Sequence, residues 1–112
     1  MTVIVNVEKL RPGAQLPEKQ HEDDAAFDLH ASEDALIPSL GIGIVSTGLK
    51  VEIPEHYKGS IYARSGLASK GIMLANGVGK IDAGYEGEIL VILYNTTEND
   101  LILEAGSRVA QM

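Results

Sequence analysis

Hydrophobic and polar residues alternate along much of this chain, which is typical of β-strands. The first alternation places Val3, Val5 and Val7 between polar neighbours. Further runs of strand-like composition follow at residues 43–47, 49–53, 60–63, 88–94 and 101–103. Turn-forming residues separate the runs at 11–13, 37–41, 53–55, 76–77 and 104–106. Short strands joined by polar turns predict an all-β domain, either a β-sandwich, a jelly roll or a small barrel.

Two segments depart from simple alternation. Residues 65–70 have some helical character, but Gly66 and Gly71 limit a helix there to about one or two turns. Residues 89–93 are hydrophobic at every position, so this strand should be covered on both faces. A subunit interface and a central position in a sandwich explain such a strand equally well.

The length and composition fit one domain that spans residues 1–112. The absence of cysteine excludes disulfides, thiolate zinc sites and cysteine nucleophiles. The N-terminus lacks the features of a signal peptide, and the longest hydrophobic run, residues 89–93, is far too short to span a membrane. We therefore expect a soluble cytoplasmic protein with no membrane partner.

The charge of the chain argues against a nucleic-acid partner. The formal net charge is −7, no cluster of Lys and Arg is present, and aromatic residues make up only 4% of the chain. Nucleic-acid binding needs a basic surface, often with aromatic residues that stack on bases. A smaller anionic ligand would need a local group of positive charges or a metal ion. The three arginines, Arg11, Arg64 and Arg108, are therefore informative.

Several common reactive-site motifs are absent from the sequence. Residues 41–43 begin a glycine-rich dinucleotide fingerprint, but its third glycine and its helix do not follow. There is no Walker lysine after a glycine-rich loop and no G-x-S-x-G elbow. His21, His30 and His56 lack the spacing of metal ligands, and we expect each of them at the surface.

Two segments in the first two thirds of the chain combine polar chemistry with strand ends. In residues 25–29, Asp28 is embedded in a hydrophobic run, which by itself also fits a half-buried strand with Asp28 facing outward. In residues 63–68, Arg64, Ser65 and Gly66 stand where a strand ends and a short helix begins. Backbone N–H groups, a hydroxyl and a guanidinium could together bind phosphate. Ser65 as a helix N-cap and Arg64 in a surface ion pair is an equally good interpretation.

Two later segments complete the set. Residues 76–89 are rich in glycine around Asn76, Asp82 and Tyr85, and such a hairpin lets a flat ligand approach the backbone. Asp82 could act as a general base there and Tyr85 could cover a sugar ring. Asn-Gly is also a common turn in an ordinary surface hairpin. Residues 106–112 could be no more than a turn that enters a strand.

Together and in this order, the four segments resemble the first four of the five motifs of the trimeric dUTPase (deoxyuridine triphosphate nucleotidohydrolase) family. A-A-F-D-L resembles A-G-Y-D-L, and A-R-S-G-L-A resembles P-R-S-G-L-A. G-K-I-D-A-G-Y-E-G-E-I resembles G-x-I-D-x-x-Y-x-G-E-I, and G-S-R-V-A-Q resembles G-D-R-I-A-Q. The resemblance spans roughly residues 1–112. It implies a distorted jelly roll or β-sandwich barrel with at most one short helix, assembled as a homotrimer with active sites at its subunit interfaces.

The resemblance implies hydrolysis of dUTP to dUMP and pyrophosphate, which limits uracil in DNA and supplies dUMP for dTMP synthesis. Asp82 would orient and deprotonate the water that attacks the α-phosphorus and would bond the 3′-hydroxyl. Tyr85 would pack against the deoxyribose and exclude a 2′-hydroxyl. Asn76, with backbone groups of Gly79 and Ile81, would bind the edge of uracil.

The phosphate end of the site follows from the same resemblance. Arg64, Ser65, Gly66 and Gln111 would bind the phosphate chain. Asp28 would support Mg²⁺ indirectly, through water, while the ion is held mainly by phosphate oxygens. For Arg108 the resemblance suggests a mainly structural ion pair.

The chain departs from the family most clearly at its end. The fifth motif, a glycine-rich tail that closes over the nucleotide of a neighbouring subunit, is absent, so we expect a truncated form of a longer protein. Milder departures are Ala26, Phe27, Ala63, Gly84 and Ser107. Alternatives are a dCTP deaminase, which would need a catalytic glutamate in the hairpin region, a dUTP-binding regulatory protein with little turnover, and a purely structural jelly roll.

Overall fold

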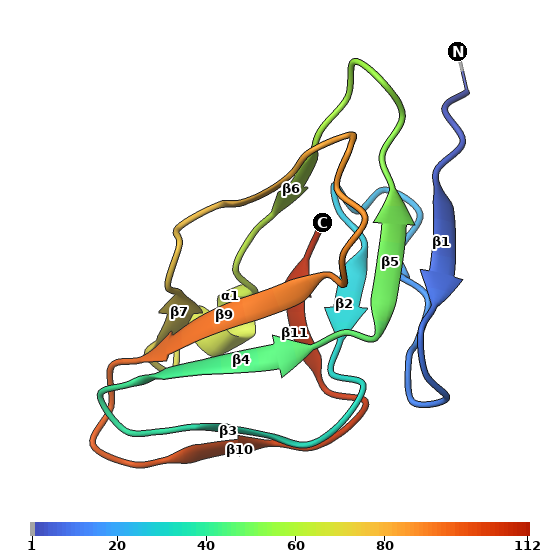
Figure 1. Cartoon of the computed structure of the whole chain (residues 1–112). Helices are drawn as coiled ribbons and strands as arrows, with labels where there is room; N and C mark the ends of the chain where they lie inside the picture. The colour runs from blue at the N-terminus through green and yellow to red at the C-terminus, as the bar shows by residue number, and fades with distance from the viewer. Residues whose placement is uncertain (1) are drawn as a thin grey trace.

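The structure, a computed structural model, describes residues 2–112 and consists of short strands with one short helix (Figure 1). The expected all-β class with a single helix is confirmed. The elements are β1 (Asn6–Lys9), β2 (Asp28–His30), β3 (Ala35–Ile37), β4 (Ile42–Ser46), β5 (Leu49–Glu52), β6 (Gly59–Ile61), α1 (Ser65–Ala68), β7 (Ile72–Leu74), β8 (Gly79–Ile81), β9 (Leu90–Asn95), β10 (Leu101–Leu103) and β11 (Arg108–Gln111).

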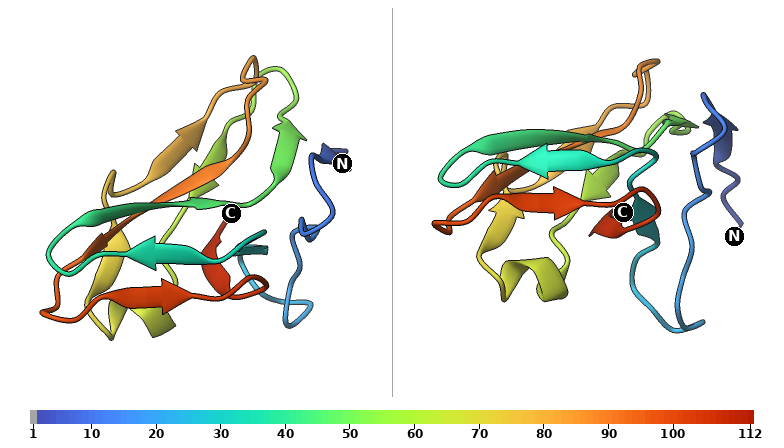
Figure 2. Two further views of the ribbon diagram at one scale, coloured as in Figure 1. Left: turned by 60° about the horizontal axis from the view of Figure 1, so that its bottom comes forward. Right: turned by 90° about the horizontal axis from the view of Figure 1, so that it is seen from below.

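The strands pair across long stretches of sequence. The two-stranded pairs are β1–β5, β3–β10, β2–β11 and β6–β8, and β4, β9 and β7 form a three-stranded sheet with β9 in the centre. All of these pairs are antiparallel, and among the described residues they do not join into one closed barrel. The views in Figure 2 place the C-terminal β11 next to β2, which is far away in the sequence.

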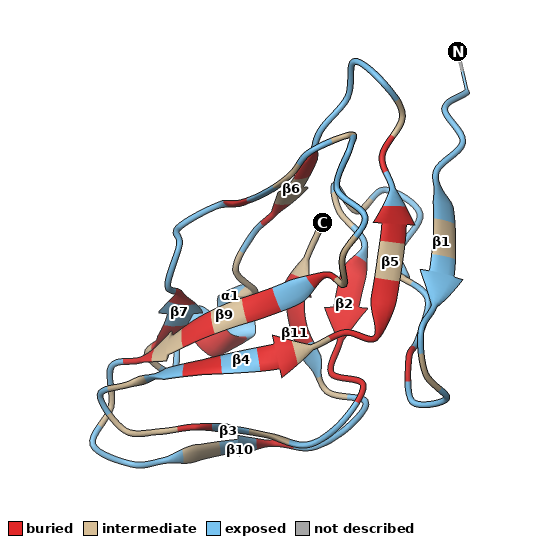
Figure 3. Cartoon of the chain, viewed as in Figure 1, coloured by how far each residue is buried: buried red, intermediate tan, exposed pale blue. Residues whose placement is uncertain are grey.

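The core is almost wholly aliphatic. Its fully buried members include Leu29, Ile37, Val45, Leu49, Ile89, Val91, Leu93 and Val109. Alternation along the strands produces this layer, because successive side chains of a strand point to opposite faces (Figure 3). In β9, for example, Val91 and Leu93 are buried while Leu90 is 44% exposed.

Within a single chain β9 is covered on one face only, so of its two explanations the central position in a sandwich is wrong. Only one face packs on the core. The other face of the β4–β9–β7 sheet carries exposed hydrophobic side chains, namely Ile42, Ile44, Met73 and Leu90. A second sheet of the same chain therefore does not cover this face, and a subunit interface remains a prediction.

Several local expectations also needed correction. The first strand begins at Asn6 rather than Val3, because pairing with β5 starts with Asn6 opposite Glu52. Gly77 forms a turn with φ +73°, but the turn is no hairpin of paired strands. Of the strands on either side of it, β7 pairs with β9 and β8 pairs with β6. The chain therefore crosses from one sheet to another at this glycine-rich turn.

The C-terminal segment is well paired. Met112 exchanges two backbone hydrogen bonds with Phe27, and Gln111 exchanges two with Tyr62. Helix α1 is short, and no helix within residues 2–112 is long and hydrophobic enough to span a membrane.

Candidate functional site

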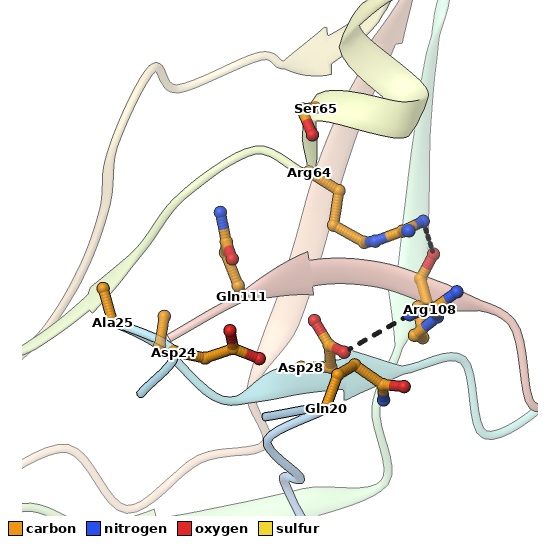
Figure 4. Close-up of a pocket in the computed structure, with 9 residues that line it drawn as sticks. Gln20, Asp24, Ala25, Asp28, Arg64, Ser65, Arg108 and Gln111 are labelled. Carbon is orange, nitrogen blue, oxygen red and sulfur yellow. Dashed lines mark hydrogen bonds and ion pairs between the residues drawn. The ribbon is translucent and has the colours of Figure 1, made fainter. Parts of the chain in front are cut away.

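A cavity of about 240 Å³ brings together residues from three of the four candidate segments (Figure 4). We call it the polar pocket. Its lining residues come from the loop before β2, from β2 itself, from the start of α1 and from β11, and they are Gln20, Asp24, Ala25, Ala26, Asp28, Arg64, Ser65, Arg108 and Gln111. The pairing of β2 with β11 creates the pocket, because it places residues from the two ends of the chain side by side.

Asp28 lies at the inner wall of the polar pocket. All three residues of β2 are buried, because β11 pairs along one edge and the backbone of Glu18 bonds to that of Asp28. The interpretation that Asp28 faces outward is therefore wrong. Within residues 2–112 its Oδ2 atom has no hydrogen-bond partner, and Arg108 Nη1 lies 3.7 Å from it. A buried carboxylate oxygen without a bond favours an ion or a water at this point.

Arg64 and Ser65 stand where the chain enters α1. Arg64 occupies the N-cap position in an extended conformation, and no side chain caps the helix. The interpretation of Ser65 as the N-cap is therefore wrong, and its exposed hydroxyl is free of that role. Arg64 does not form a surface ion pair either: its Nη1 donates a hydrogen bond to the carbonyl of Arg108, at 3.3 Å. Gly66 follows within the exposed first turn of α1.

Gln111 connects β11 to the segment before α1. Its Nε2 donates to the carbonyl of Ala63 at 3.2 Å, and its backbone is paired with that of Tyr62. The positions of Arg64 and Ser65 relative to Asp28 are thus fixed by backbone pairing rather than by flexible side chains. Figure 4 shows Asp28, Arg64 and Gln111 around the pocket on three different segments, with Arg64 extending toward the carbonyl of Arg108.

The formal charges lining the polar pocket cancel. Arg64 and Arg108 contribute two positive charges, and Asp24 and Asp28 contribute two negative charges. A polyphosphate would therefore find donors here but no net positive charge. Within residues 2–112 no group of three or more His, Cys, Asp or Glu side chains is placed to hold a metal by itself.

The remaining candidate residues, Asn76, Gly79, Ile81, Asp82 and Tyr85, lie outside the polar pocket. Gly79 and Ile81 belong to β8 beside β6, and Asn76 is exposed in the turn before β8. Asp82 is exposed, and Lys80 Nζ lies 3.3 Å from its carboxylate. A single chain therefore keeps these residues, which form one stretch of sequence, apart from the residues of the polar pocket.

Tyr85 belongs to the loop of residues 82–88, which lies near the β5–β6 loop in Figure 1. A turn begins the loop, in which the Tyr85 N–H donates to the carbonyl of Asp82 at 3.0 Å. Tyr85 is 42% exposed and lines a cavity of about 300 Å³ with Lys50 and Glu52 of β5. The side chain is thus partly accessible to a ligand.

Sequence reasoning missed an ion pair between Arg11 and Glu88. The guanidinium of Arg11 donates to both carboxylate oxygens of Glu88, at 2.9 and 2.8 Å. The Arg11 bonds, with those from Ser46 and Gly48, lower the pKa of Glu88 to about 2. The same pair raises the pKa of Arg11. The partners are 77 positions apart, so no local pattern could have indicated the contact.

His30 is buried in β2, not at the surface as expected. All three residues of β2, which pairs with β11, are buried. The Nδ1 atom of His30 has no hydrogen-bond partner in the described residues. His21 and His56 are exposed.

Comparisons with known proteins agree on one family. The dUTPase family model matches residues 13–112. The deoxyuridine 5′-triphosphate nucleotidohydrolase of Clostridium tetani is 40% identical over 109 residues, which cover 96% of this chain and 75% of the relative. The enzyme of the same name from Paramecium bursaria Chlorella virus 1 is 44% identical over 107 residues, covering 95% of this chain and 74% of the relative.

Solved structures give the same result at lower identity. A dUTPase of phage phi11 of Staphylococcus aureus, described with a structural Mg(II) ion, superposes with a TM-score of 0.89 and 26% identity over 97% of this chain and 88% of its own. The dUTPase of Staphylococcus bacteriophage 80alpha with dUpNHpp superposes with a TM-score of 0.90 and 28% identity, over 98% and 80% respectively.

Proposed function

The chain belongs to the dUTPase family, and from this membership we propose that it hydrolyses dUTP to dUMP and pyrophosphate. The observation that carries the proposal is the polar pocket, in which Asp28, Arg64, Ser65 and Gln111 meet although they come from distant segments. Hydrolysis at phosphorus needs an aligned water, a base and neutralised oxygens, and the two groups of candidate residues supply these between them.

The polar pocket takes the phosphate chain. Arg64 offers a planar set of donors, and Ser65 offers a hydroxyl that no helix cap uses. The amide of Gln111 and the backbone of Gly66 complete the set of donors. The ion pair of Arg108 with Asp28 orients both side chains at the pocket wall.

Magnesium fits the polar pocket as a companion of the phosphates. The lining charges cancel, so a triphosphate requires an additional cation, and Asp28 presents a carboxylate oxygen without a hydrogen bond. Mg²⁺ typically binds through one or two carboxylates, several waters and substrate phosphates. Asp28 would hold it indirectly, through water. When bound, the ion neutralises charge on the phosphate oxygens.

The second group binds the nucleoside and activates water. The Asp82 carboxylate accepts a proton from water as the water oxygen bonds to the α-phosphorus, and the bond to the bridging oxygen breaks to release pyrophosphate. Asp82 also accepts a hydrogen bond from the 3′-hydroxyl. Tyr85 packs against the sugar, while Asn76 and the backbone of Gly79 and Ile81 bind the uracil edge.

A homotrimer would bring the two groups together at its subunit interfaces. The separation of the groups within one chain supports this assembly. So does the exposed hydrophobic face of the β4–β9–β7 sheet, where Ile44 is 59% exposed. Exposed faces of this kind are commonly buried between subunits.

Pyrophosphate release, measured at full natural chain length with dUTP, dCTP, dTTP and UTP, tests the function. We expect turnover of dUTP far above that of the other three. Equal turnover of all four, or none, would sink the proposal. Sedimentation of the same sample tests the trimer separately.

The deaminase alternative is not favoured. Glu88, one of two glutamates in residues 76–89, is held by Arg11, which lowers its pKa to about 2, so it is poorly suited to proton transfer near neutral pH. Ammonia release from dCTP would support the deaminase. A binding protein without turnover would instead bind dUpNHpp in a calorimeter while releasing no pyrophosphate from dUTP.

A further inference from the structure

Glu88 ends the 82–88 loop and is held by the body of the protein through several donors. Its Oε1 accepts from Arg11 Nη2, and its Oε2 accepts from Arg11 Nη1, from the Ser46 hydroxyl and from the Gly48 N–H at 3.0 Å. The side chain of Glu88 is 17% exposed, against 38% for Arg11. A forked, partly buried pair of this kind is geometrically specific.

This carboxylate makes the main side-chain hydrogen bonds between the loop and the body, while Ala83 of the loop packs against the core. Apart from the ion pair between Asp82 and its neighbour Lys80, the described residues show no other hydrogen bond between residues 82–88 and the rest of the protein. The network extends further into the body, because the Ser46 hydroxyl also lies 2.9 Å from that of Ser32.

Tyr85 is coupled to the same residue. Its hydroxyl donates to the backbone carbonyl of Glu88 at 2.7 Å. Gly87 makes this contact possible, since a Cβ at that position would lie 2.6 Å from the Tyr85 hydroxyl oxygen. The turn from Asp82 to Tyr85 completes a continuous connection from Arg11 through Glu88 to both residues.

We propose that Arg11 and Glu88 are positioning residues that fix the ring of Tyr85 and the adjacent Asp82 turn, and thereby set the preference for a deoxyribose over a ribose. The inference rests on the proposed function, in which Tyr85 packs against the sugar. Neither residue touches the substrate. Without this carboxylate the end of the loop beside Tyr85 loses its bonds to Arg11, Ser46 and Gly48. Small displacements of positioning groups are costly.

The test compares Glu88→Gln with Glu86→Gln, a matched change two positions away at an exposed side chain. For Glu88→Gln we expect kcat/KM for dUTP relative to UTP to fall about 10-fold, mainly through KM, with melting still cooperative. Glu86→Gln should keep the wild-type ratio. Arg11→Lys should restore part of what Arg11→Met loses, because an ammonium keeps the charge but not the fork.

Tyr85→Phe provides a second route if the Glu88 variant fails to fold. It removes only the hydroxyl bond to Glu88, and we expect the same loss of sugar preference with an unchanged melting temperature. An unchanged dUTP-to-UTP ratio in a folded Glu88→Gln protein, or in Tyr85→Phe, would overturn the inference.

Calorimetry with dUMP and UMP separates this inference from the proposed function. It measures sugar preference without turnover, so wild-type protein that releases no pyrophosphate contradicts only the proposed function. A preference for dUMP that weakens about 10-fold in Glu88→Gln supports the positioning role. A wild-type protein without preference, or a variant that retains it, contradicts the positioning role.

Discussion

The polar pocket and the 82–88 loop hold their candidate residues in different ways. In the pocket, Asp28 and Gln111 sit on paired strands, and backbone hydrogen bonds fix their positions. In the loop, Asp82 and Tyr85 depend on one carboxylate that Arg11 holds. The candidate residues of the pocket are therefore held by paired strands, whereas the ring of Tyr85 is held through the side-chain bonds of Glu88. Substitutions should consequently act on phosphate binding and sugar selection separately.

The largest effect is expected at Asp82. Asp82→Asn removes the proposed base while keeping the size of the side chain, so kcat for dUTP should fall about 10²- to 10⁴-fold. Steady-state pyrophosphate release measures it. The control is Lys80→Met, which removes the neighbouring cation and should change kcat by less than about 3-fold. Near-normal turnover by Asp82→Asn would exclude this residue as the base.

A change in the polar pocket ranks next. Arg64→Met removes the planar donors but retains a long side chain, and kcat/KM for dUTP should fall about 100-fold. The ratio of dUTP to UTP should stay constant, because the loop that contacts the sugar is untouched. A variant that alters this ratio would show that the pocket and the loop are not independent.

The anchor of the loop should also appear in the pH dependence of stability. The pKa of Glu88 is lowered from 4.5 to about 2 in the folded protein, so its ionised form stabilises the fold. This contribution is complete above about pH 4.5 and is lost as the pH falls towards 2. At neutral pH, Glu88→Gln should lower the free energy of unfolding by about 1–2 kcal/mol.

Urea unfolding at several pH values measures that difference. The difference in the free energy of unfolding between wild type and Glu88→Gln should become smaller as the pH falls from 4.5 to 2. Glu86→Gln should follow the wild-type curve throughout. If this difference in free energy stays constant down to pH 2, the negative charge of Glu88 does not stabilise the fold.

The smallest expected effect is a difference in KM for dUTP between substitutions at two glycines of the same loop. A Cβ at Gly84 would meet nothing within 4 Å, whereas at Gly87 it would press on the Tyr85 hydroxyl. Gly87→Ala should raise KM for dUTP about 3- to 10-fold by displacing the ring, and Gly84→Ala should leave it unchanged. Equal KM values for both variants would show that the position of the ring is unimportant.

The sequence determined the class of fold and the chemistry of the candidate residues. Alternation predicted most strands within a few residues, because a strand on a core buries every second side chain. It did not reveal β3, β7 and β8. The four motifs also led to the correct family.

Only the tertiary structure decided which residues meet. Pairing of β2 with β11 placed Asp28 beside Arg108 and turned the Asp28 carboxylate inward. The sequence alone also allowed Asp28 to face outward. The crossing at Gly77 put β7 and β8 in different sheets, where a hairpin was expected. Arg11 and Glu88 bond across 77 positions. Such contacts depend on how distant strands register, and a local pattern of side chains carries no information about that register.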